Sequence, residues 1–320
     1  MIKAENLTMR YGPVIALKDA SFEVQHSEIV GLLGPNGAGK STTMKILTTY
    51  LHPSGGTAKV GGIDVLEDPL KVRKIIGYLP ETLPLYMDME VRTYLNFVGR
   101  ARGLHGDKLK QRVGWVIEEC GLRSMYRRII RELSKGYRQR TAIAQALIHD
   151  PEVIILDEPT SGLDPHQIIE IRRLIRNLAA GRTVILSTHI LQEVEAVADR
   201  IVIINHGRIV ASGTINELRD RATKSEKVRI SAIGTKAEVK SVLSSIASAE
   251  RVDFAGELDD YVSFEVRGKK GAKLWREMGH VARAKGWELG ELTNVPMSLE
   301  DTFLSLTESA SAHAGKGGAA

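Results

Sequence analysis

The sequence predicts an α/β protein with two domains, and three observations lead to this prediction. Its 320 residues exceed the length of one typical domain. Strand-like and helix-like segments alternate through residue 220, a pattern that is typical of a sheet with parallel strands. From residue 221 to about 308 the order changes to β-α-β-β-α-β, which predicts a smaller, ferredoxin-like α+β domain.

The elements of the first domain, residues 1–220, are predicted from short apolar runs and the residues that flank them. Val153–Leu156 is apolar and lies between two prolines, which favours a strand buried on both faces. Pro165 suits the first turn of a helix, and His206-Gly207 suits a turn between two strands. Two helices without strand partners predict a helical lobe at about 82–150. The predicted strands are Glu28–Leu33, Gly77–Leu79, Val153–Leu156, Thr183–Leu186, Arg200–Asn205 and Arg208–Ala211, and the predicted helices are Lys40–Leu51, Glu90–Arg102, Lys108–Cys120, Pro165–Ala179 and Leu191–Ala198.

The second domain follows a polar stretch, Asp220–Glu226, which we interpret as a linker. Its predicted strands are Val228–Ala232, Arg251–Glu257, Tyr261–Val266 and Trp287–Leu292, and its predicted helices are Ala237–Ala247 and Ala272–Lys285. A further short helix, Ser298–Thr307, begins with a capping-box-like pair, Ser298 and Asp301. The tail, 309–320, has no periodicity and is expected to be disordered.

Composition limits the class of protein. Hydrophobic residues make up 43% of the chain and charged residues 26%, as in soluble globular proteins. The apolar runs have the length of strands and are far shorter than the roughly 18 residues that a membrane helix needs. Cys120 is the single cysteine, so no internal disulfide can form and a reducing cytoplasm is expected.

The net charge is +5, and part of this excess lies between Arg123 and Arg140. A nucleic-acid footprint is one interpretation of such a basic run. No nucleic-acid motif is visible and interleaved aromatic residues are nearly absent, so a solvated helix face or a phosphate-binding neighbourhood is the simpler interpretation. No nucleic-acid partner is expected.

A phosphate-binding loop follows the first predicted strand. Gly34-Pro35-Asn36-Gly37-Ala38-Gly39-Lys40-Ser41 matches G-x-x-x-x-G-K-[ST] and lies between a strand and a helix, as the mechanism of this motif requires. The glycines let backbone N–H groups converge on phosphate oxygens, and the N-terminus of the helix adds positive potential. Lys40 is expected to reach the β- and γ-phosphates, and the Ser41 hydroxyl to bind Mg²⁺.

The phosphate-binding loop alone is compatible with a kinase, a GTPase or an ATPase. Two carboxylates at the end of the strand Val153–Leu156 reduce these possible enzyme classes. Asp157 is placed to hold Mg²⁺, and Glu158 to orient or deprotonate an attacking water. His189 follows the next strand and is expected at the same rim of the sheet. The alternative is that these residues are only polar strand ends and an ordinary histidine.

A second small-residue turn, Leu133-Ser134-Lys135-Gly136, precedes the helical segment that contains Ala142–Leu147. Ser134 suits the N-cap of this helix. The turn could serve only as a helix start, or it could also bind phosphate through the N-terminus of its helix.

With GPNGAGKST (34–42), LSKGYRQR (133–140), LDEPTSGLDP (156–165) and STH (187–189) in this order, the chain resembles the ATP-binding subunit of ABC transporters over about residues 1–220. The resemblance implies a mixed sheet core with a helical lobe. It also implies that ATP lies between the phosphate loop of one copy and the signature turn, residues 133–136, of a second copy or a homologous subunit.

Further roles are implied residue by residue. Tyr11 resembles the aromatic residue that stacks on adenine, with an ordinary core tyrosine as the alternative. Thr42 resembles the residue at the α-phosphate, Glu158 the catalytic carboxylate, and His189 the histidine that senses the γ-phosphate. Ser134 and Gly136 are expected to contact the partner's ATP. Leu133, Lys135 and Asp164 are expected at the interface between the copies.

Two residues depart from the family pattern. Glu81 stands where the family usually has glutamine, so it is a candidate Mg²⁺ ligand that also adds negative charge near ATP. In the signature, Lys135 replaces a glycine and Tyr137 a glutamine, whereas Ser134 and Gly136 are retained. Since Glu158 and His189 are both present, the resemblance implies ATP hydrolysis.

The chain resembles the ABC-2 exporter branch, and most closely the gliding-motility type of ATPase subunit. The features that carry this resemblance are the segment YLPETLPLYMDMEVRTYLNF (78–97), the signature and the second domain. This implies a separate integral-membrane permease and a peripheral location at the cytoplasmic face of the plasma membrane. Leu83, Leu85, Tyr86 and Met87 are candidate permease contacts, unless they fill the core of the helical lobe. A soluble ATP-gated clamp, or a mechanical or regulatory ATPase not engaged in transport, is the alternative function.

Overall fold

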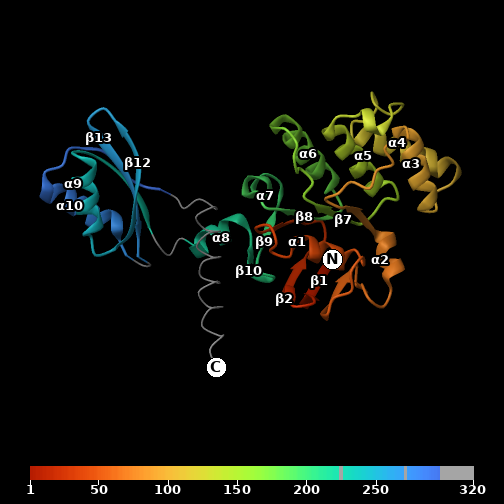
Figure 1. Cartoon of the computed structure of the whole chain (residues 1–320), viewed down its shortest axis with the longest axis horizontal. Helices are drawn as coiled ribbons and strands as arrows, with labels where there is room; N and C mark the ends of the chain where they lie inside the picture. Colours follow the sequence, from red (N-terminus) through yellow and green to blue (C-terminus); the bar gives the residue numbers. More distant parts are fainter. Residues whose placement is uncertain (223–225, 270–271, 296–320) are drawn as a thin grey trace. The chain divides into compact units, whose positions relative to one another are not determined.

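The computed structural model describes residues 1–222, 226–269 and 272–295, and the chain divides into two compact units, Met1–Ile215 and Asn216–Ala320. Both units are drawn in Figure 1. Helix α8 (Ile215–Ala222) continues into the stretch predicted as a linker, so the first three residues of that stretch are helical. The predicted helix Ser298–Thr307 and the predicted disordered tail lie outside the described residues.

A six-stranded sheet forms the centre of the first unit (Figure 1). Its strands run parallel, except that β10 is antiparallel to β9. Five buried residues in each of the central strands β3 and β7 explain why these segments are continuous apolar runs. In sheet order the strands are β10 (Arg208–Gly213), β9 (Arg200–Asn205), β3 (Ile29–Leu33), β8 (Thr183–Thr188), β7 (Val153–Asp157) and β6 (Ile76–Leu79).

A second, antiparallel sheet of four strands belongs to the same unit and was not predicted from the sequence. Its long strands β1 and β2 are joined by a turn at Gly12-Pro13 and show three register shifts, which interrupt the alternation of apolar and polar residues. In sheet order the strands are β2 (Val14–Val24), β1 (Ile2–Tyr11), β4 (Gly55–Val60) and β5 (Ile63–Asp64).

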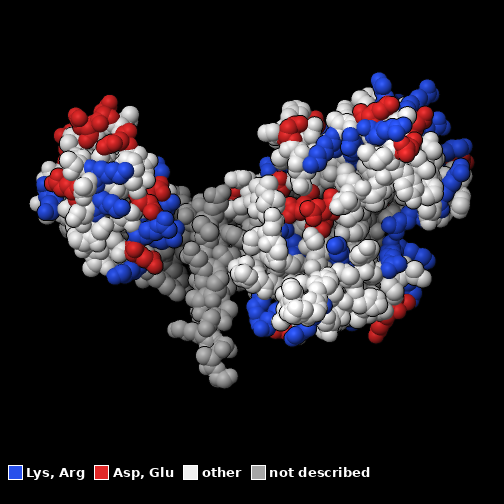
Figure 2. Space-filling view, in the orientation of Figure 1, with Lys and Arg blue, Asp and Glu red and all other residues white. Residues whose placement is uncertain are grey.

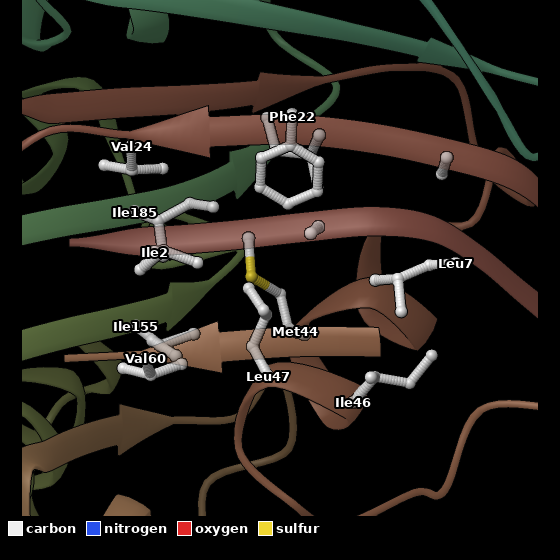
Figure 3. Packing of buried hydrophobic residues seen from close by; sticks show 14 of the residues in the cluster. Ile2, Leu7, Phe22, Val24, Met44, Ile46, Leu47, Val60, Ile155 and Ile185 are labelled. Carbon is white, nitrogen blue, oxygen red and sulfur yellow. The ribbon is translucent and has the colours of Figure 1, made fainter. Parts of the chain in front are cut away.

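The main core lies where helix α1 (Lys40–Leu47) packs between these sheets (Figure 3). Met44 and Leu47 of α1 are fully buried and face side chains of β1, β4, β7 and β8. The helix ends at Leu47, so the prediction that it continues to Leu51 is wrong. The Thr48 hydroxyl donates to the carbonyl of Met44, and Thr49 has a left-handed φ of 61°, which stops the helix.

The helical lobe consists of α3, α4 and α5, which pack against one another. Two further helices, α6 and α7, follow β7 and β8, and α2 precedes β6. The bounds are α2 (Pro69–Ile75), α3 (Val91–Ala101), α4 (Gly106–Glu119), the 3₁₀ turn η1 (Ile130–Glu132), α5 (Lys135–Leu147), α6 (Pro165–Leu178) and α7 (Leu191–Val197).

The second unit contains an antiparallel sheet in the order β12-β13-β11-β14, with two helices. The chain order is β-α-β-β-α-β, and together with this strand order it gives the ferredoxin-like arrangement. Its core is built around Phe264, which is fully buried. The bounds are β11 (Lys227–Ile233), α9 (Lys236–Ser244), β12 (Ala249–Leu258), β13 (Tyr261–Gly268), α10 (Leu274–Lys285) and β14 (Leu289–Asn294).

Among the described residues, none of the helices combines the length and the apolar character that crossing a membrane requires.

Candidate functional site

The phosphate loop connects β3 to α1, and its backbone explains its glycines. A Cβ atom on Gly34 would lie 2.3 Å from the carbonyl oxygen of Ile204, and one on Gly39 would lie 2.7 Å from that of Ala16. Gly39 also has a φ of 106°. Gly37 has a φ of 79° and faces open space. The loop therefore needs glycine for close approach at positions 34 and 39, and for backbone conformation at 37 and 39.

Lys40, the first residue of α1, is held by three oxygens. Its Nζ donates to the carbonyl oxygens of Gly34 at 2.8 Å and Pro35 at 3.2 Å, and lies 3.4 Å from Oε1 of Glu158. The residue is only 6% exposed. An ammonium has three donors, and all three find oxygen partners within the protein. Phosphate oxygens can replace these partners without any change in the hydrogen-bonding type.

Asp157 and Ser41 place two hard oxygen ligands side by side. The Ser41 hydroxyl donates to Oδ1 of Asp157 at 3.2 Å, and the Ser187 hydroxyl donates to the same carboxylate oxygen. Asp157 is 2% exposed. A hydroxyl and a carboxylate next to a phosphate site are ligands that Mg²⁺ accepts, so the residues present fit this ion. Glu81 lines the same cavity as Ser41.

Glu158 follows β7 in an unusual backbone conformation. Its φ is 49°, in the left-handed region that non-glycine residues avoid. Its N–H donates to the hydroxyl oxygen of Ser187 at 3.0 Å. Its carboxylate contacts Lys40 on one side and Nδ1 of His189 on the other, at 3.0 Å. Since a carboxylate only accepts, Nδ1 carries the hydrogen in this contact.

Lys40, Ser41, Glu158 and His189 line one cavity of about 520 Å³. The residues that line it from the phosphate loop and the start of α1 are Asn36, Gly37, Gly39, Lys40, Ser41 and Thr42. The other lining residues are Glu158, His189, Ala16, Glu81 and Ser161. The cavity combines the buried cation of Lys40, the N-terminus of α1 without a side-chain cap, and the carboxylate of Glu158. These groups can bind phosphates and support the hydrolysis of a phosphoanhydride.

Several residues predicted for the nucleotide site do not line this cavity. Gly34 and Ala38 are buried in the loop, and Pro35 is exposed outside the cavity. Asp157, predicted as a metal ligand, is buried and contacts the cavity only through the Ser41 hydroxyl. Tyr11 is the last residue of β1 and is 45% exposed, so it is not the core tyrosine of the alternative interpretation.

The signature turn lies at a second cavity, of about 540 Å³, which shares no lining residue with the first. Ser134 caps α5 by accepting the N–H of Tyr137 at 3.4 Å, and Asp164 caps α6 by accepting the N–H of Gln167 at 2.9 Å. Lining residues include Ser134, Gly136 and Asp164. Leu133 is 4% exposed and packs inside the protomer, so its side chain has almost no surface to offer a partner.

Three lining or supporting residues were missed by sequence reasoning. Ala16 and Ser161 line the nucleotide cavity, and Ser187 binds both Asp157 and Glu158. Ser187 is the first residue of the STH motif, so its position near the carboxylates could have been predicted from this motif. Ala16 lies in the sheet that was not predicted, and nothing in its local sequence indicates the site.

The four candidate permease contacts lie in the loop between β6 and α3. Tyr86 is 53% exposed and Met87 38%, whereas Leu83 and Leu85 are half-buried. The Tyr86 ring packs against Phe97, which is itself 45% exposed, at 5.5 Å between centroids. The loop therefore carries an aromatic contact on the surface of the helical lobe, in addition to two half-buried leucines.

The basic run between Arg123 and Arg140 is partly neutralised by acidic residues. Arg123 pairs with Glu118, Arg131 with Asp88, and Arg140 with Glu170. Figure 2 shows basic and acidic side chains interspersed over the helical lobe. This pattern favours a solvated face over a continuous nucleic-acid footprint.

Comparison with known families and proteins gives a consistent result. The family described as ABC transporter matches residues 17–161. An uncharacterized ABC transporter ATP-binding protein, YxlF of Bacillus subtilis, is 39% identical over 69% of this chain and 73% of its own length. The linearmycin resistance ATP-binding protein LnrL of Bacillus subtilis is 32% identical over 96% of this chain and 98% of its own. The Nod factor export ATP-binding protein I of Sinorhizobium fredii is 33% identical over 96% of this chain and 85% of its own.

Solved structures share the fold of the first unit. The ATP-binding subunit of an ABC transporter is 32% identical, with a TM-score of 0.63 over 69% of this chain and 92% of its own. The ATP-binding cassette MJ0796, in a dimeric post-hydrolysis state bound to ADP and Pi, is 25% identical, with a TM-score of 0.62 over 67% of this chain and 99% of its own.

Proposed function

From the chain's membership of the ABC transporter ATP-binding family, whose nucleotide domains are ATPases, we propose that this protein drives a separate membrane permease of an ABC-2 exporter. ATP lies between two head-to-tail copies, or between this chain and a homologous subunit. The observation that carries the proposal is that the chain has two small-residue turns, each at the N-terminus of a helix and each at its own cavity, with no lining residue in common. One protomer therefore offers two different halves of a nucleotide site.

The phosphate loop holds the triphosphate in the first half. Lys40 exchanges its contacts with Gly34, Pro35 and Glu158 for phosphate oxygens, and this exchange frees one side of the Glu158 carboxylate. Ser41 and Asp157 are the residues that would hold Mg²⁺, with Glu81 as a further candidate. When bound, the ion neutralises charge on the phosphates.

Glu158 acts on the attacking water. Its carboxylate orients the water and accepts its proton, and the water oxygen bonds to the γ-phosphorus as the bond to the ADP oxygen breaks. His189 holds the carboxylate through Nδ1 and senses the γ-phosphate. Tyr11, exposed at the end of β1, supplies the stacking surface for adenine. ADP and phosphate are the products.

The partner's signature turn completes the site. The Ser134 hydroxyl and the Gly136 N–H face the γ-phosphate, with the N-terminus of α5 behind them. Lys135 and Asp164 lie at the interface between the copies. The dimeric, product-bound state of MJ0796 supports this arrangement as a precedent in a similar cassette.

Export and the ABC-2 branch are inferred from the relatives. LnrL is a linearmycin resistance protein and the Sinorhizobium fredii protein is a Nod factor export protein, and each matches 96% of this chain. The closer resemblance to the gliding-motility type stays a prediction. The permease would receive the loop 83–87, which would hold the protein at the cytoplasmic face of the plasma membrane.

Purification of the protein from native membranes in mild detergent tests the transport assignment. The expected result is co-purification of an integral-membrane protein that stimulates ATP hydrolysis. Recovery with soluble partners alone would instead favour an ATP-gated clamp or a regulatory ATPase.

The variant Leu85→Asp sharpens this test. It places a charge in the loop proposed to contact the permease, and charged residues are depleted at the cores of protein interfaces, so stimulation should be lost. Affinity for ATP should not change, because Leu85 does not line the nucleotide cavity. Leu70→Asp on α2, a 71% exposed leucine, is the control, and stimulation that survives in Leu85→Asp would argue against this contact.

A further inference from the structure

Glu193, in the first turn of α7, is a buried carboxylate close to the nucleotide site. It is 2% exposed, and among the described residues it forms no ion pair with lysine or arginine. Its two oxygens each accept a hydroxyl hydrogen: Oε1 from Thr160 at 2.5 Å and Oε2 from Thr188 at 2.6 Å. Burial of a carboxylate is costly, so a residue retained with only two hydroxyl partners calls for an explanation.

The two threonines belong to the two loops that carry the reacting side chains. Thr160 is 5% exposed and lies two residues after Glu158, in the loop that leads to Asp164. Thr188 is fully buried and immediately precedes His189. Glu193 therefore bridges the loop of the carboxylate and the loop of the imidazole through one pair of short hydrogen bonds.

Thr188 also extends the bridge to the phosphate loop. Its carbonyl oxygen accepts the N–H of Gly34 at 3.3 Å, and its hydroxyl accepts the N–H of Ile190 at 3.1 Å. The two loops and the first glycine of the phosphate loop thus share one hydrogen-bonded network with Glu193 at its centre.

Helix α7 gives this network a fixed base. A Cβ atom on Gly31, in the centre of β3, would lie 2.0 Å from Cγ1 of Val194, so α7 is seated directly on the strand backbone. Val194 is fully buried and adjacent to Glu193. The position of the Glu193 carboxylate is therefore set by the strand that leads into the phosphate loop.

We propose that Glu193 is a positioning residue, which holds Glu158 and His189 at the separation required for hydrolysis. The inference rests on the proposed roles of these two residues. Glu158 has a left-handed backbone with a φ of 49°, a conformation that persists only where surrounding contacts hold it. The Thr160 contact with Glu193 supplies such a hold on the same loop.

The test compares kcat and KM for ATP in Glu193→Gln, which keeps the size of the side chain but has one acceptor oxygen, so it can accept the hydrogen of only one threonine hydroxyl. We expect kcat to fall by about tenfold or more while KM stays within about twofold, because misplaced reacting groups affect the chemical step more than ground-state binding. Glu195→Gln, a half-buried carboxylate on the same helix, is the control and should retain kcat.

Variants of the two threonines separate positioning from simple core packing. Thr160→Val and Thr188→Val remove each hydroxyl at nearly constant volume and should reproduce the loss in kcat. Thr160→Ser and Thr188→Ser restore the hydroxyl and should restore kcat. The loss in kcat in the double valine variant should be little greater than in either single variant, because loss of one of the two hydrogen bonds to Glu193 already disconnects the two loops.

Two results would overturn the proposal. One is an unchanged kcat in Glu193→Gln and in both valine variants. The other is a lower melting temperature with unchanged kcat, which would make Glu193 a structural residue only. If Glu193→Gln does not fold, the threonine series alone decides. Failure of the proposed function is distinct, since it would appear as wild-type protein without ATPase activity, or with activity unchanged in Glu158→Gln.

Discussion

The phosphate loop and the signature turn each lead into a helix N-terminus, but they differ in how far the protomer satisfies them. In the phosphate loop, Lys40 is 6% exposed and bonded to three oxygens of its own chain. In the signature turn, Ser134 and Lys135 are exposed, and the Ser134 hydroxyl oxygen accepts a long N-cap hydrogen bond of 3.4 Å from the Tyr137 N–H. The lysine of the first region is therefore enclosed by its own chain, whereas two residues of the second are exposed and its Gly136 is buried against Gln167.

This difference indicates that the two turns have different roles in binding phosphate. A loop whose cation already has internal partners can bind phosphate by exchanging those partners, so it needs no second protein to be ordered. A helix N-terminus with exposed residues gains most from an anion that arrives from elsewhere. The protomer is therefore complete for nucleotide binding and incomplete for the closed site that we propose.

Removal of the buried cation should have the largest effect. Lys40→Ala leaves Glu158 with His189 alone and leaves the phosphates without their cation, so ATPase activity should fall by roughly a thousandfold or more, with weaker ATP binding. Steady-state hydrolysis and equilibrium binding measure the two effects. Lys45→Ala, on the same helix but outside the cavity, should retain both. Activity near wild type in Lys40→Ala would refute the assignment of this loop.

Removal of the signature hydroxyl should have a smaller effect of a different kind. Ser134→Ala should lower kcat by about ten- to a hundredfold while one protomer still binds ATP normally, because the hydroxyl acts on the partner's nucleotide. Protein melting followed with and without ATP reports the binding.

A mixture of the two variants sharpens the contrast between the turns. A dimer of Lys40→Ala with Ser134→Ala has one doubly defective site and one intact site. Mixing the two should therefore raise activity well above that of either variant alone, toward about a quarter of wild type for random pairing. Activity that equals the mean of the separate variants would show that both turns act within one copy.

The carboxylate at position 81 should affect metal dependence by a modest factor. Glu81 lines the cavity that contains Ser41, so Glu81→Gln removes a negative charge from the surroundings of the metal. We expect the half-saturating Mg²⁺ concentration to rise by about three- to tenfold, with maximal activity largely retained. Titration of ATPase activity with Mg²⁺ measures this. An unchanged titration would place Glu81 outside the metal's environment.

The smallest predicted effect concerns the anchor of α5 at the end opposite the signature turn. His149 follows this helix and its Nε2 lies 2.9 Å from the carbonyl oxygen of Ile76 in β6. Burial, reinforced by Arg102, lowers the pKa of His149 to about 4. The unfolded chain, with an ordinary histidine pKa near 6.5, takes up the proton first, so this contribution to stability is complete above pH 6.5 and is lost as the pH falls toward 4.

Urea unfolding at pH 7.5 and pH 5.0 measures this contribution. Between pH 7.5 and pH 5.0 the free energy of unfolding should fall by about 1 kcal/mol more in wild type than in His149→Gln. This figure allows for the partial exposure of the ring to solvent. Equal losses in the two proteins would show that His149 does not hold α5 to the sheet in the way its contacts indicate.

The phosphate loop and the parallel strands could be predicted because their signals are local. Gly34–Ser41 is a contiguous motif between a strand and a helix, and Val153–Asp157 is a continuous buried run. The antiparallel sheet was missed because the register shifts between β1 and β2 break the two-residue period on which strand prediction depends.

The bridge through Glu193 could not be predicted, since Thr160 and Glu193 are 33 positions apart and meet only after β7, β8 and α7 have assembled. The contacts of Lys40 illustrate the same limit. The motif indicates what this side chain binds in the loaded site, whereas its pairing with Glu158 depends on a backbone conformation at position 158 that the sequence does not reveal.

Sedimentation of Glu158→Gln with excess ATP and without Mg²⁺ tests the central claim most directly. With hydrolysis blocked, nucleotide held between two copies should double the mass of the protein, and the additional change Ser134→Ala should return it to the monomer. A protein that stays monomeric at every ATP concentration, while still binding ATP, would contradict the account.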